Sequence, residues 1–523
     1  MATKPLLFLL LFCITVPLND ALRFLVFVPV YTKSHSILGH AVVDHLLDAG
    51  HEVVHITSHP KKKIVPKLQE IDVLDISMRI MNQYRTPDAL KITNIANKGA
   101  APLFFITVVH EMHKQMFEDP EIRQFFNDPE QKFDAVIVEW LFSHFVAGIA
   151  PLFKCPLIWL VTTQAHWQVL DVVDEISNPA FSADIFSTNI PPFTTWQRFE
   201  ELWALVKRSI EFRYFITPAE RRIYDSSLRK IAQRRGVVLP PYEEAIYNGS
   251  LLLINSHPSI GQPYRLPQNA KYVAGFHIDA KVKPLPKDLQ HLMDTTKHGA
   301  IYFSMGSHTA SENMSDHMKS SLLIMFSKLR ETVIWKFEGE MQNVPENVHL
   351  VKWAPQQSIL AHPNLKLFIT HGGQLSTTEA IHFGIPIIGI PTMGDQHINM
   401  KTVVQKGFGI TVNLAENMAA DLYKAIKEVS ANPIYKRKAE ELSRIYHDRP
   451  LSPKSELLFW IEHVVKTKGA LHLRSPALQI PMYKKLYIDL LVFLLIVMYV
   501  LFRKARSIVC KQNKVIRKKV KKN

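Results

Sequence analysis

The residues best suited to bind an anion lie where an apolar segment, 367–370, runs into the sequence His-Gly-Gly at 371–373 and then into a helical pattern. The first turn of a helix carries unpaired N–H groups and the positive end of the helix dipole, so this arrangement favours an anion. A second apolar segment, 385–390, is followed by Asp395 and Gln396. Open α/β sheets bind ligands at the carboxyl ends of their strands, so both segments predict polar contacts with a ligand.

A candidate base lies near the other end of the chain. His35 follows the apolar segment 23–28 and directly precedes a helical pattern, which places it at the carboxyl edge of a first predicted sheet. An imidazole titrates near neutrality and can take a proton from a hydroxyl group. The chain has 24 histidines, so only its position distinguishes His35, and His40 is expected to face the helix surface.

The elements that must position these residues alternate between strands and helices. Strands predicted at 23–28 and 53–56 flank a helix over 37–46, and a strand at 135–138 is followed by a helix over 142–153. Such alternation implies a parallel sheet with crossover helices. The predicted fold class is therefore α/β.

The second half of the chain repeats this pattern. Strands are predicted at 300–303 and 332–337, a turn of small residues at 304–307, and a helix over 318–329. The polar stretch 277–286 contains two prolines and suits a linker between domains. At 523 residues, the chain is long enough for two such α/β domains.

The spacing between residues 353 and 396 resembles the signature of the UDP-glycosyltransferase family. The matching residues are Trp353, Gln356, His371, Gly373, Ser376, Glu379, Gly384, Pro386, Asp395 and Gln396. The likeness extends along the whole chain and is closest to the insect branch of the animal enzymes that conjugate small lipophilic molecules. It implies two doubly wound Rossmann-like domains facing across a cleft (GT-B type), with an acceptor-binding domain over 22–280 and a UDP-sugar-binding domain over 287–455.

The resemblance also implies a catalytic pair. The Ser-His in which the family places its base matches Ser34 and His35, and the family's orienting Asp falls on Glu139, which is one methylene longer. Such a carboxylate fixes the tautomer of the base and stabilises its charged form. The alternative is that Glu139 is an ordinary strand-end residue in solvent. Asp134 begins the same strand and lies at the wrong edge.

In the donor half, the resemblance assigns stacking on uracil to Trp353 and contacts with the nucleoside to Gln356 and Glu379. It implies that the diphosphate is held by His371, Ser376 and nearby backbone N–H groups such as that of Gly373. Ser304 and Ser307 would line the facing glycine turn, and Asp395 and Gln396 would bind sugar hydroxyls. One position departs from the pattern, because Leu375 stands where mammalian relatives have Asn.

The implied reaction is a direct displacement that inverts the anomeric configuration, with His35 as the base. The UDP-sugar is a co-substrate, and neither a metal nor another cofactor is expected. Mammalian glucuronosyl relatives carry an Arg near the segment 253–257, where this chain has Asn255. A sugar carboxylate favours a cation, so glucose is preferred and glucuronic acid is the alternative. A catalytically silent binding or carrier protein is the alternative of another class, which Glu139 and Leu375 would support.

The net charge of +15 is concentrated at the C-terminus. Residues 503–523 hold ten Lys and Arg and no acidic residue, which leaves +5 elsewhere and argues against a nucleic-acid-binding body. The segment 456–485 leads to an apolar run, 486–502, which predicts a membrane-spanning helix with a cytosolic tail; a buried helix is the alternative. Residues 1–21 predict a signal peptide, with a signal anchor as the alternative.

These segments predict a single-pass protein of the endoplasmic reticulum membrane with a lumenal body. Asn248 and Asn313 begin N-x-S/T triplets and would carry glycans there. Of three cysteines only Cys155 would be lumenal, as a small buried apolar residue without a disulfide partner. The apolar segment 103–109 predicts a core helix, with a membrane-touching patch as the alternative. A homo-oligomer is a further expectation from the resemblance.

Overall fold

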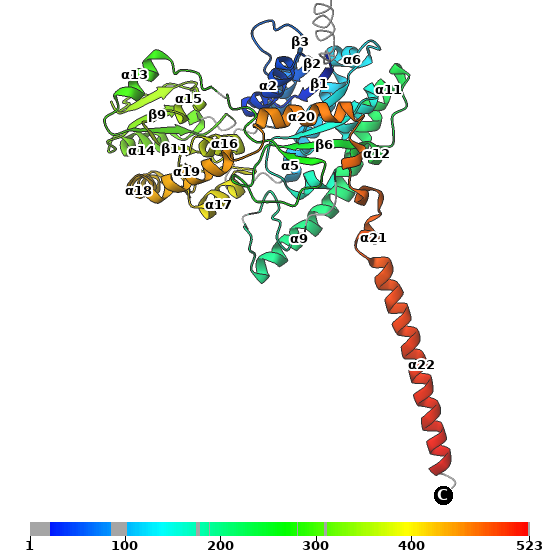
Figure 1. The fold of residues 1–523 in the computed structure, drawn as a ribbon. Helices are drawn as coiled ribbons and strands as arrows, with labels where there is room; N and C mark the ends of the chain where they lie inside the picture. The colour runs from blue at the N-terminus through cyan, green and yellow to red at the C-terminus, as the bar shows by residue number, and fades with distance from the viewer. Residues whose placement is uncertain are drawn as a thin grey trace, which may run out of the picture. The chain divides into compact units, whose positions relative to one another are not determined.

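The computed structural model describes residues 21–84, 102–173, 178–187, 189–279, 281–307 and 311–520. The predicted signal sequence therefore lies almost entirely outside the described residues. The chain divides into two compact units, one that ends at Leu473 and one that begins at Arg474. The larger unit contains both β-sheets (Figure 1).

The first sheet is parallel and has the strand order β3-β2-β1-β4-β5-β6-β7. Its strands are β1 Arg23–Val28, β2 Glu52–Thr57, β3 Leu68–Asp72, β4 Ala135–Trp140, β5 Leu157–Val161, β6 Gly249–Ile254 and β7 Ala270–Tyr272. The chain order reverses between β1 and β4, and crevices that bind ligands form at such a point in parallel sheets.

The second sheet is also parallel, with the order β10-β9-β8-β11-β12-β13. Its strands are β8 Ala300–Ser304, β9 Thr332–Lys336, β10 Val348–Val351, β11 Leu365–Thr370, β12 Ile387–Gly389 and β13 Gly409–Thr411. Here the order reverses between β8 and β11, so the two sheets share one topological plan. The prediction of two parallel α/β sheets is confirmed.

Helices cover both sheets. Those of the first half are α2 Lys33–Asp48, α3 Leu74–Tyr84, α5 Pro102–Glu118, α6 Pro120–Asn127, η2 Phe145–Gly148, α7 Ile149–Phe153, α8 Trp167–Asp171, α9 Thr195–Glu211, η3 Phe212–Ile216, α10 Thr217–Ile223, η4 Tyr224–Leu228, α11 Arg229–Arg235 and α12 Tyr242–Ile246. Those of the second half are α13 Lys287–Thr295, η5 Ser311–Asn313, α14 Asp316–Phe326, α15 Gln356–Leu360, α16 Gln374–His382, α17 Gln396–Lys406, α18 Ala419–Ala431, α19 Pro433–His447, α20 Pro453–Lys466 and η6 Leu471–Leu473.

The helix predicted over 142–153 begins later than expected. Strand β4 continues to Trp140, and Phe142 has a φ of 52°, a left-handed conformation that no α-helix continues through. The chain becomes helical only at η2 and α7. The segment 103–109 does belong to a core helix, because Ile106, Val108 and Val109 of α5 are buried.

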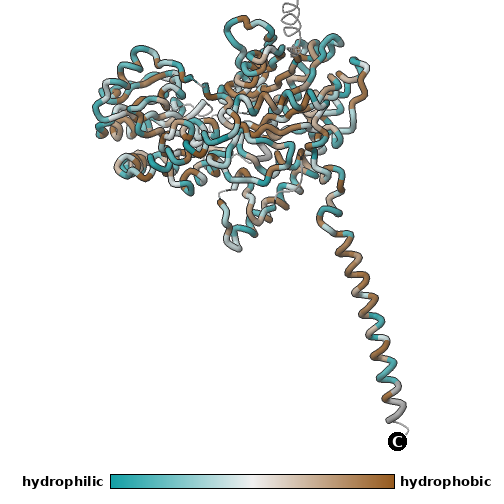
Figure 2. The backbone as a smooth tube through the Cα atoms, in the orientation of Figure 1, coloured by the Kyte–Doolittle hydropathy of each residue, from teal (hydrophilic) through white to brown (hydrophobic). Residues whose placement is uncertain are grey.

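The core of the first sheet has two layers because side chains alternate along each strand. Leu25 and Phe27 of β1 pack on the face covered by α5 and α6, whereas Val26 packs on the face covered by α2. The strands are drawn mainly in brown in Figure 2, as expected for strands that are buried on both faces. Burying each such side chain contributes about 1.5–3 kcal/mol.

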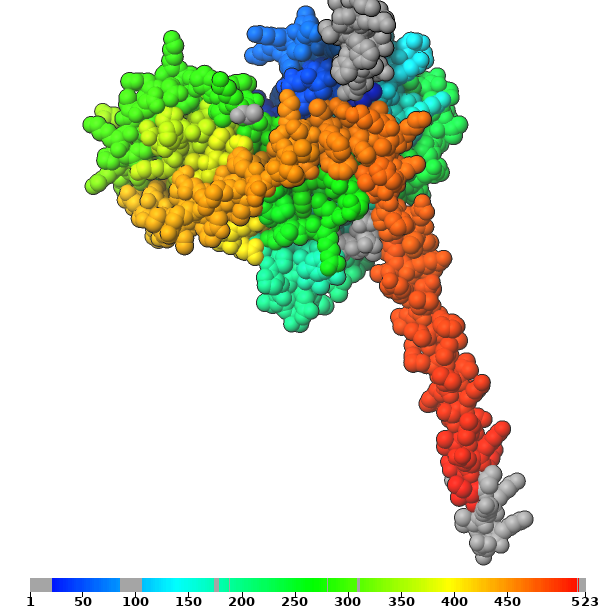
Figure 3. All heavy atoms as spheres, in the orientation of Figure 1, coloured from blue at the N-terminus to red at the C-terminus, as the bar shows by residue number. Residues whose placement is uncertain are grey.

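Helix α20 carries the chain back from the second sheet to the first (Figure 3). Its residues Leu457, Ile461 and Val464 are buried in the same cluster as β1 and α2. The helix begins at a cap, where the Ser452 hydroxyl accepts a 3.1 Å hydrogen bond from the Ser455 N–H. The apolar stripe of α20 thus completes the core of the first half, although α20 follows the second sheet in the sequence.

The second unit consists of η7 Pro476–Gln479, α21 Met482–Lys485 and α22 Ile488–Val520. In the parts of the chain that the structure describes, no helix is both long enough and apolar enough to cross a membrane. The predicted span over 486–502 is therefore not supported. Its apolar part within α22 begins only at Ile488, and the same helix continues directly into Arg503 and Lys504.

Candidate active site

His35 and Glu139 lie side by side at the carboxyl edge of the first sheet. Helix α2 begins at Lys33, so His35 lies in its first turn and not in the predicted loop, and Glu139 is the fifth residue of β4. Nδ1 of His35 donates a hydrogen bond to Oε1 of Glu139, and the Thr162 hydroxyl lies 3.5 Å from the same nitrogen. This contact fixes the tautomer and leaves Nε2 as the lone-pair nitrogen of the neutral ring.

The surroundings of His35 favour its protonated form. Burial of the imidazole acts most strongly and lowers its pKa, but the charge and hydrogen bond of Glu139, together with the charge of Asp395, raise the pKa above its ordinary value. Glu139 is only 1% exposed, so its carboxylate is screened little by water. The alternative that Glu139 is a solvated strand-end residue is wrong.

Asp395 reaches this pair from the second sheet. Burial raises the pKa of its carboxyl group, while a hydrogen bond from Asn399 and the charge of His35 act in the opposite direction. The Asn399 amide donates to Asp395 Oδ2 at 2.9 Å and to the Gly372 carbonyl at 3.0 Å. It also accepts a 2.6 Å hydrogen bond from Gln164 of the first half. Asn399 thus joins both halves at the site.

A second group of predicted residues meets at the start of α15 and on α16. The Gln356 amide donates to Glu379 at 2.6 Å and to the Ser376 hydroxyl at 3.3 Å. Gln357 donates to the other oxygen of Glu379 at 3.3 Å and to the His277 carbonyl at 3.2 Å. Glu379 is therefore held by two amides, and its placement is independent of any ligand.

The two glycine turns enclose the ring of His371. Gly306 has a φ of +83°, and a Cβ added there would come within 2.4 Å of the His371 ring. A Cβ added at Gly373 would come within 2.5 Å of the same ring. Ser304 is buried, and its hydroxyl accepts a 3.3 Å hydrogen bond from the Gly306 N–H, so it shapes the turn. Ser307 follows the turn and is half-buried.

Trp353 lies next to this turn with 53% of its surface exposed. Two ammonium groups approach its ring: that of Lys33 lies 4.3 Å from the centroid and that of Lys336 lies 5.7 Å from it. Lys336 also donates a 2.9 Å hydrogen bond to the Gly306 carbonyl. Lys336 is also paired with the Glu338 carboxylate, so among the described residues the unpaired positive charge beside Trp353 comes from Lys33, and it favours an anionic ligand there.

Gln396 is occupied mainly by its own loop. Its side-chain oxygen accepts hydrogen bonds from the Thr392 N–H at 2.7 Å, the Thr392 hydroxyl at 2.8 Å and the Met393 N–H at 3.1 Å. The side chain is 6% exposed. Gln396 thus fixes the loop that presents Asp395, with its NH₂ group remaining as the donor.

The side chain at the irregular position, Leu375, packs against the core of the first half. Its neighbour Gln374 donates a 2.9 Å hydrogen bond to the Asn255 carbonyl, and the Asn255 amide donates to the Thr162 carbonyl at 3.2 Å. Gln374 and Asn255 are both buried, so this stretch holds the two halves together.

The structure collects most of the predicted residues into three groups and adds Gly306 and Lys336 to them. They are His35, Glu139 and Asp395; Gln356, Ser376 and Glu379; and Gly306, His371 and Gly373 with Lys336 and Trp353. Sequence reasoning missed Lys33, Thr162, Gln164, Lys336 and Asn399. For Lys33 and Thr162 the available signal was their proximity to the carboxyl ends of β1 and β5.

Three side chains away from the site could be considered as metal ligands. Ligand atoms of His40, His55 and Glu70 lie within 4.8 Å of one another. His55 Nδ1 already donates to Glu70 at 3.2 Å, and His40 Nε2 donates to the His59 carbonyl at 2.7 Å. The charge of Lys61 acts on His55 as well, which disfavours a further cation, so the group is described as a hydrogen-bond network.

The predicted modification sites and Cys155 lie away from these groups. Asn248 and Asn313 are exposed. Cys155 is half-buried, and burial raises the pKa of its thiol to about 12, so it stays a neutral thiol at physiological pH.

The sequence profile of the family described as "UDP-glucoronosyl and UDP-glucosyl transferase" matches residues 24–522. UDP-glucosyltransferase 2 of Dactylopius coccus is 30% identical over 493 residues, which cover 94% of this chain and 93% of that protein. UDP-glucuronosyltransferase 2B15 of Rattus norvegicus is 38% identical over 254 residues, about half of each chain (48% and 47%).

Solved structures show the same fold. The crystal structure of glycosyltransferase VinC in complex with DTDP covers 85% of this chain and 100% of its own, with a TM-score of 0.53 and 16% identity. The structure of the glycosyltransferase of kitacinnamycin gives a TM-score of 0.52 at 15% identity. The predicted GT-B class is confirmed at the level of the fold.

Proposed function

Since the chain belongs to the UDP-glucuronosyl and UDP-glucosyl transferase family, we propose that it moves glucose from UDP-glucose to a hydroxyl group of a small lipophilic acceptor. The single observation that carries this proposal is the contact between His35 and Glu139, with Asp395 nearby from the other sheet. This contact supports His35 as the proposed base, Glu139 as its orienting carboxylate and Asp395 as a nearby polar group of the donor half.

In the proposed reaction, Nε2 of His35 takes the proton of the acceptor hydroxyl. The acceptor oxygen then forms a bond to the anomeric carbon while the bond to the UDP oxygen breaks, and the configuration inverts. Glu139 stabilises the imidazolium that forms. The proton resides on His35, and UDP leaves with the bonding electron pair. Holding both substrates next to each other supplies much of the rate.

The donor roles are proposed on the three groups described above. Trp353 stacks on uracil, Gln356 and Glu379 bind the nucleoside, and the turns around His371 hold the diphosphate. Ser304, Ser307 and Ser376 support this region, while Asp395 and Gln396 bind sugar hydroxyls. The ammonium group of Lys33 adds positive charge where the leaving group becomes more negative.

Glucose is preferred because Asn255 provides no cation for a sugar carboxylate, and its amide is already directed at the Thr162 carbonyl. UDP-glucuronic acid is the second donor to test, since the chain is also similar to glucuronosyltransferases. We also propose that the body of the protein lies in the lumen of the endoplasmic reticulum, where Asn248 and Asn313 would carry glycans. After expression in insect cells, Asn248→Gln and Asn313→Gln should each run faster on an electrophoresis gel because a glycan is lost.

The decisive experiment supplies the full chain with labelled UDP-glucose or UDP-glucuronic acid and a panel of phenols. Conjugates should form with UDP-glucose, and His35→Ala should lower the rate by about 10²–10⁴-fold while UDP binding persists. His40→Ala on the same helix is the matched control and should retain the rate. UDP binding without any conjugate would instead identify a binding or carrier protein.

A further inference from the structure

Helix α9 is attached to the rest of the larger unit by its polar side. Glu201, in the middle of the helix, is only 3% exposed. Its carboxylate accepts hydrogen bonds from the Asp184 N–H at 2.9 Å, from the Asn189 amide at 2.9 Å and from the Ser187 hydroxyl. A carboxylate buried in this way is paired by three donors, as burial of a charge requires.

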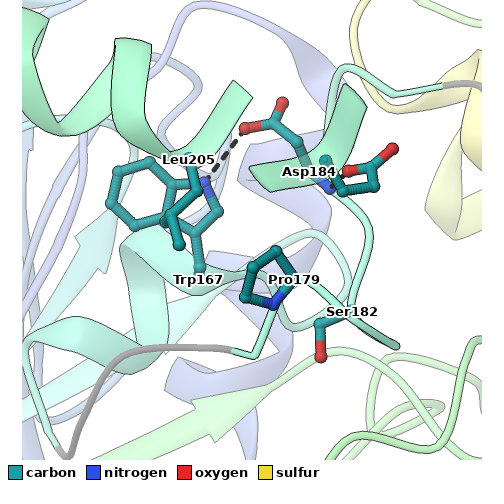
Figure 4. A pocket seen from close by; sticks show the side chains of 6 residues that line it. Trp167, Pro179, Ser182, Asp184 and Leu205 are labelled. Carbon is teal, nitrogen blue, oxygen red and sulfur yellow. Dashed lines mark hydrogen bonds between the residues drawn. The ribbon is translucent and has the colours of Figure 1, made fainter. Parts of the chain in front are cut away.

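Two turns along the helix, Arg208 continues this polar inner side. Its guanidinium contacts Asp184 at 3.1 Å, and the same carboxylate accepts a 3.0 Å hydrogen bond from the Trp167 indole. Figure 4 shows Trp167 and Asp184 meeting beneath the helix, with Leu205 beside them. The cavity between them measures about 10 Å³, which leaves no room for a ligand.

The outer side of α9 is apolar. The side chains at helical spacing on this side are Trp196, Phe199, Trp203, Val206 and Ile210, which are 41–67% exposed. Tyr214 and Phe215 extend the surface beyond the end of the helix at 65% and 62% exposure. Amphipathic helices of soluble domains place their apolar side inward, so α9 has the reverse orientation. It protrudes from the larger unit in Figures 1 and 3.

Exposed cations outnumber exposed acids along the stretch 195–222, although Lys207 lies 3.9 Å from Glu211 and Arg221 pairs with Glu243. The exposed basic residues of the stretch 195–222 are Arg198, Lys207, Arg213, Arg221 and Arg222. The exposed acidic residue among the same positions is Glu200, because Glu201 and Glu220 are buried and Glu211 is half-buried. Trp and Phe on one side with Lys and Arg around them are typical of a helix that lies in the plane of a membrane interface.

We propose that the outer surface of α9, from Trp196 to Phe215, docks onto an anionic lipid surface and inserts its aromatic side chains among the headgroups. Charge complementarity decides between this occupant and a second copy of the chain. A symmetric dimer through this surface would bring two copies of its excess positive charge into one interface, whereas anionic headgroups neutralise that charge. The proposal concerns the larger unit alone and does not depend on α22.

Fluorescence quenching by brominated lipids tests the proposal on the full chain. Helix α22 contains no tryptophan, so quenching reports the larger unit. Vesicles of dibrominated phosphatidylcholine with phosphatidylserine should quench the wild-type protein, and Trp196→Gln with Trp203→Gln should lose most of that quenching. Trp460→Gln, on α20, is the matched control and should leave it unchanged. Thermal unfolding of each variant verifies that the fold is intact.

The charge of the lipid provides a second measurement. Lys207→Gln should weaken quenching at equal phosphatidylserine content, with a shift of the midpoint in lipid concentration of roughly five-fold. The same substitution should have little effect with neutral vesicles. The proposal is wrong if wild type and the double tryptophan variant are quenched equally, or if the double variant converts a dimer to a monomer in sedimentation while quenching is unchanged.

Discussion

The ammonium group of Lys33, in the first turn of α2, lies 4.3 Å from the centroid of the Trp353 ring in the loop after β10. This pair joins the first sheet's ligand edge to the ring proposed to stack on uracil. If the base stacks on the same face of the ring, Lys33 competes with it, although its charge also attracts the diphosphate.

Uridine separates these two effects because it has no phosphate. Lys33→Met should tighten uridine binding about two- to five-fold, since an exposed cation–π contact of about 0.5–1 kcal/mol no longer has to be broken. UDP binding should improve less than uridine binding, or weaken, because Lys33→Met also removes the positive charge that attracts the diphosphate. Titration calorimetry measures both, with Lys61→Met as a control far from the ring. Unchanged uridine affinity would show that the base does not use that face.

The pH dependence of transfer tests the link between Glu139 and His35. A general base acts in its neutral form, so the rate rises as pH passes the pKa of His35, which Glu139 raises. Glu139→Gln removes that charge, so the acidic limb of kcat/KM should move to lower pH while the plateau falls. Glu139→Asp should retain more of the plateau than Glu139→Gln.

The matched control for this experiment is Glu70→Gln. It alters another histidine–carboxylate pair, His55 with Glu70, on the same sheet but outside the proposed site. An acidic limb that shifts equally in both variants would indicate a general electrostatic effect and remove the special role of Glu139.

The sequence predicted the contacts that follow from strand order and missed those that join the two halves. His35 was predicted from its place after the first strand and from the family resemblance, and Glu139 from the resemblance alone. In the structure they meet because β1 and β4 are neighbours. Gln164 and Asn399 are 235 positions apart, and no periodicity connects them. The reverse orientation of α9 depends on where Asp184 meets the helix, which a pattern of apolar residues leaves undetermined.

A substitution in the glycine turn at Gly306 should differ clearly from the same substitution at Gly236, which follows helix α11. Gly306→Ala places a methyl group against the His371 ring at a φ of +83°, so it should weaken UDP-sugar binding by roughly ten-fold or more and lower stability by about 1–2 kcal/mol. Gly236→Ala shares the left-handed backbone (φ +65°) but has no atom within 4 Å. It should show the stability loss with an unchanged KM.

Steady-state kinetics and thermal unfolding measure these two properties separately. Equal KM values for both glycine variants would mean that the His371 ring is not part of the donor site. A stability loss confined to Gly306→Ala would contradict the backbone argument and leave the ring contact as the sole cause.

A buried carboxylate outside the site should dominate the stability of the first half. Glu220 is fully buried and accepts hydrogen bonds from the His144 N–H at 2.6 Å, from His144 Nδ1 at 3.1 Å and from Tyr242, and it contacts His110 at 3.0 Å. Burial acts to raise its pKa, but the charges of His144 and His110 hold the pKa far below its usual range. Glu220→Gln should therefore cost about 3–5 kcal/mol.

This cost should depend on pH in a defined direction. A carboxylate with a lowered pKa stabilises the fold above the ordinary carboxyl value of 4.5, and this contribution is lost as pH falls below it. Burial lowers the pKa of His144, yet Glu220 raises it overall, so the contribution of that imidazolium is full below its ordinary value of 6.5 and is lost as pH rises through the raised value. The difference in the free energy of unfolding between wild type and Glu220→Gln should thus be largest between about pH 4.5 and 6.5.

Urea unfolding followed by fluorescence at several pH values checks this prediction. The control is Glu243→Gln, at an exposed partner of Arg221, which should change stability by at most about 1 kcal/mol. A difference that stays constant from pH 4 to 8 would mean that packing around residue 220, rather than its charge, carries the stabilisation.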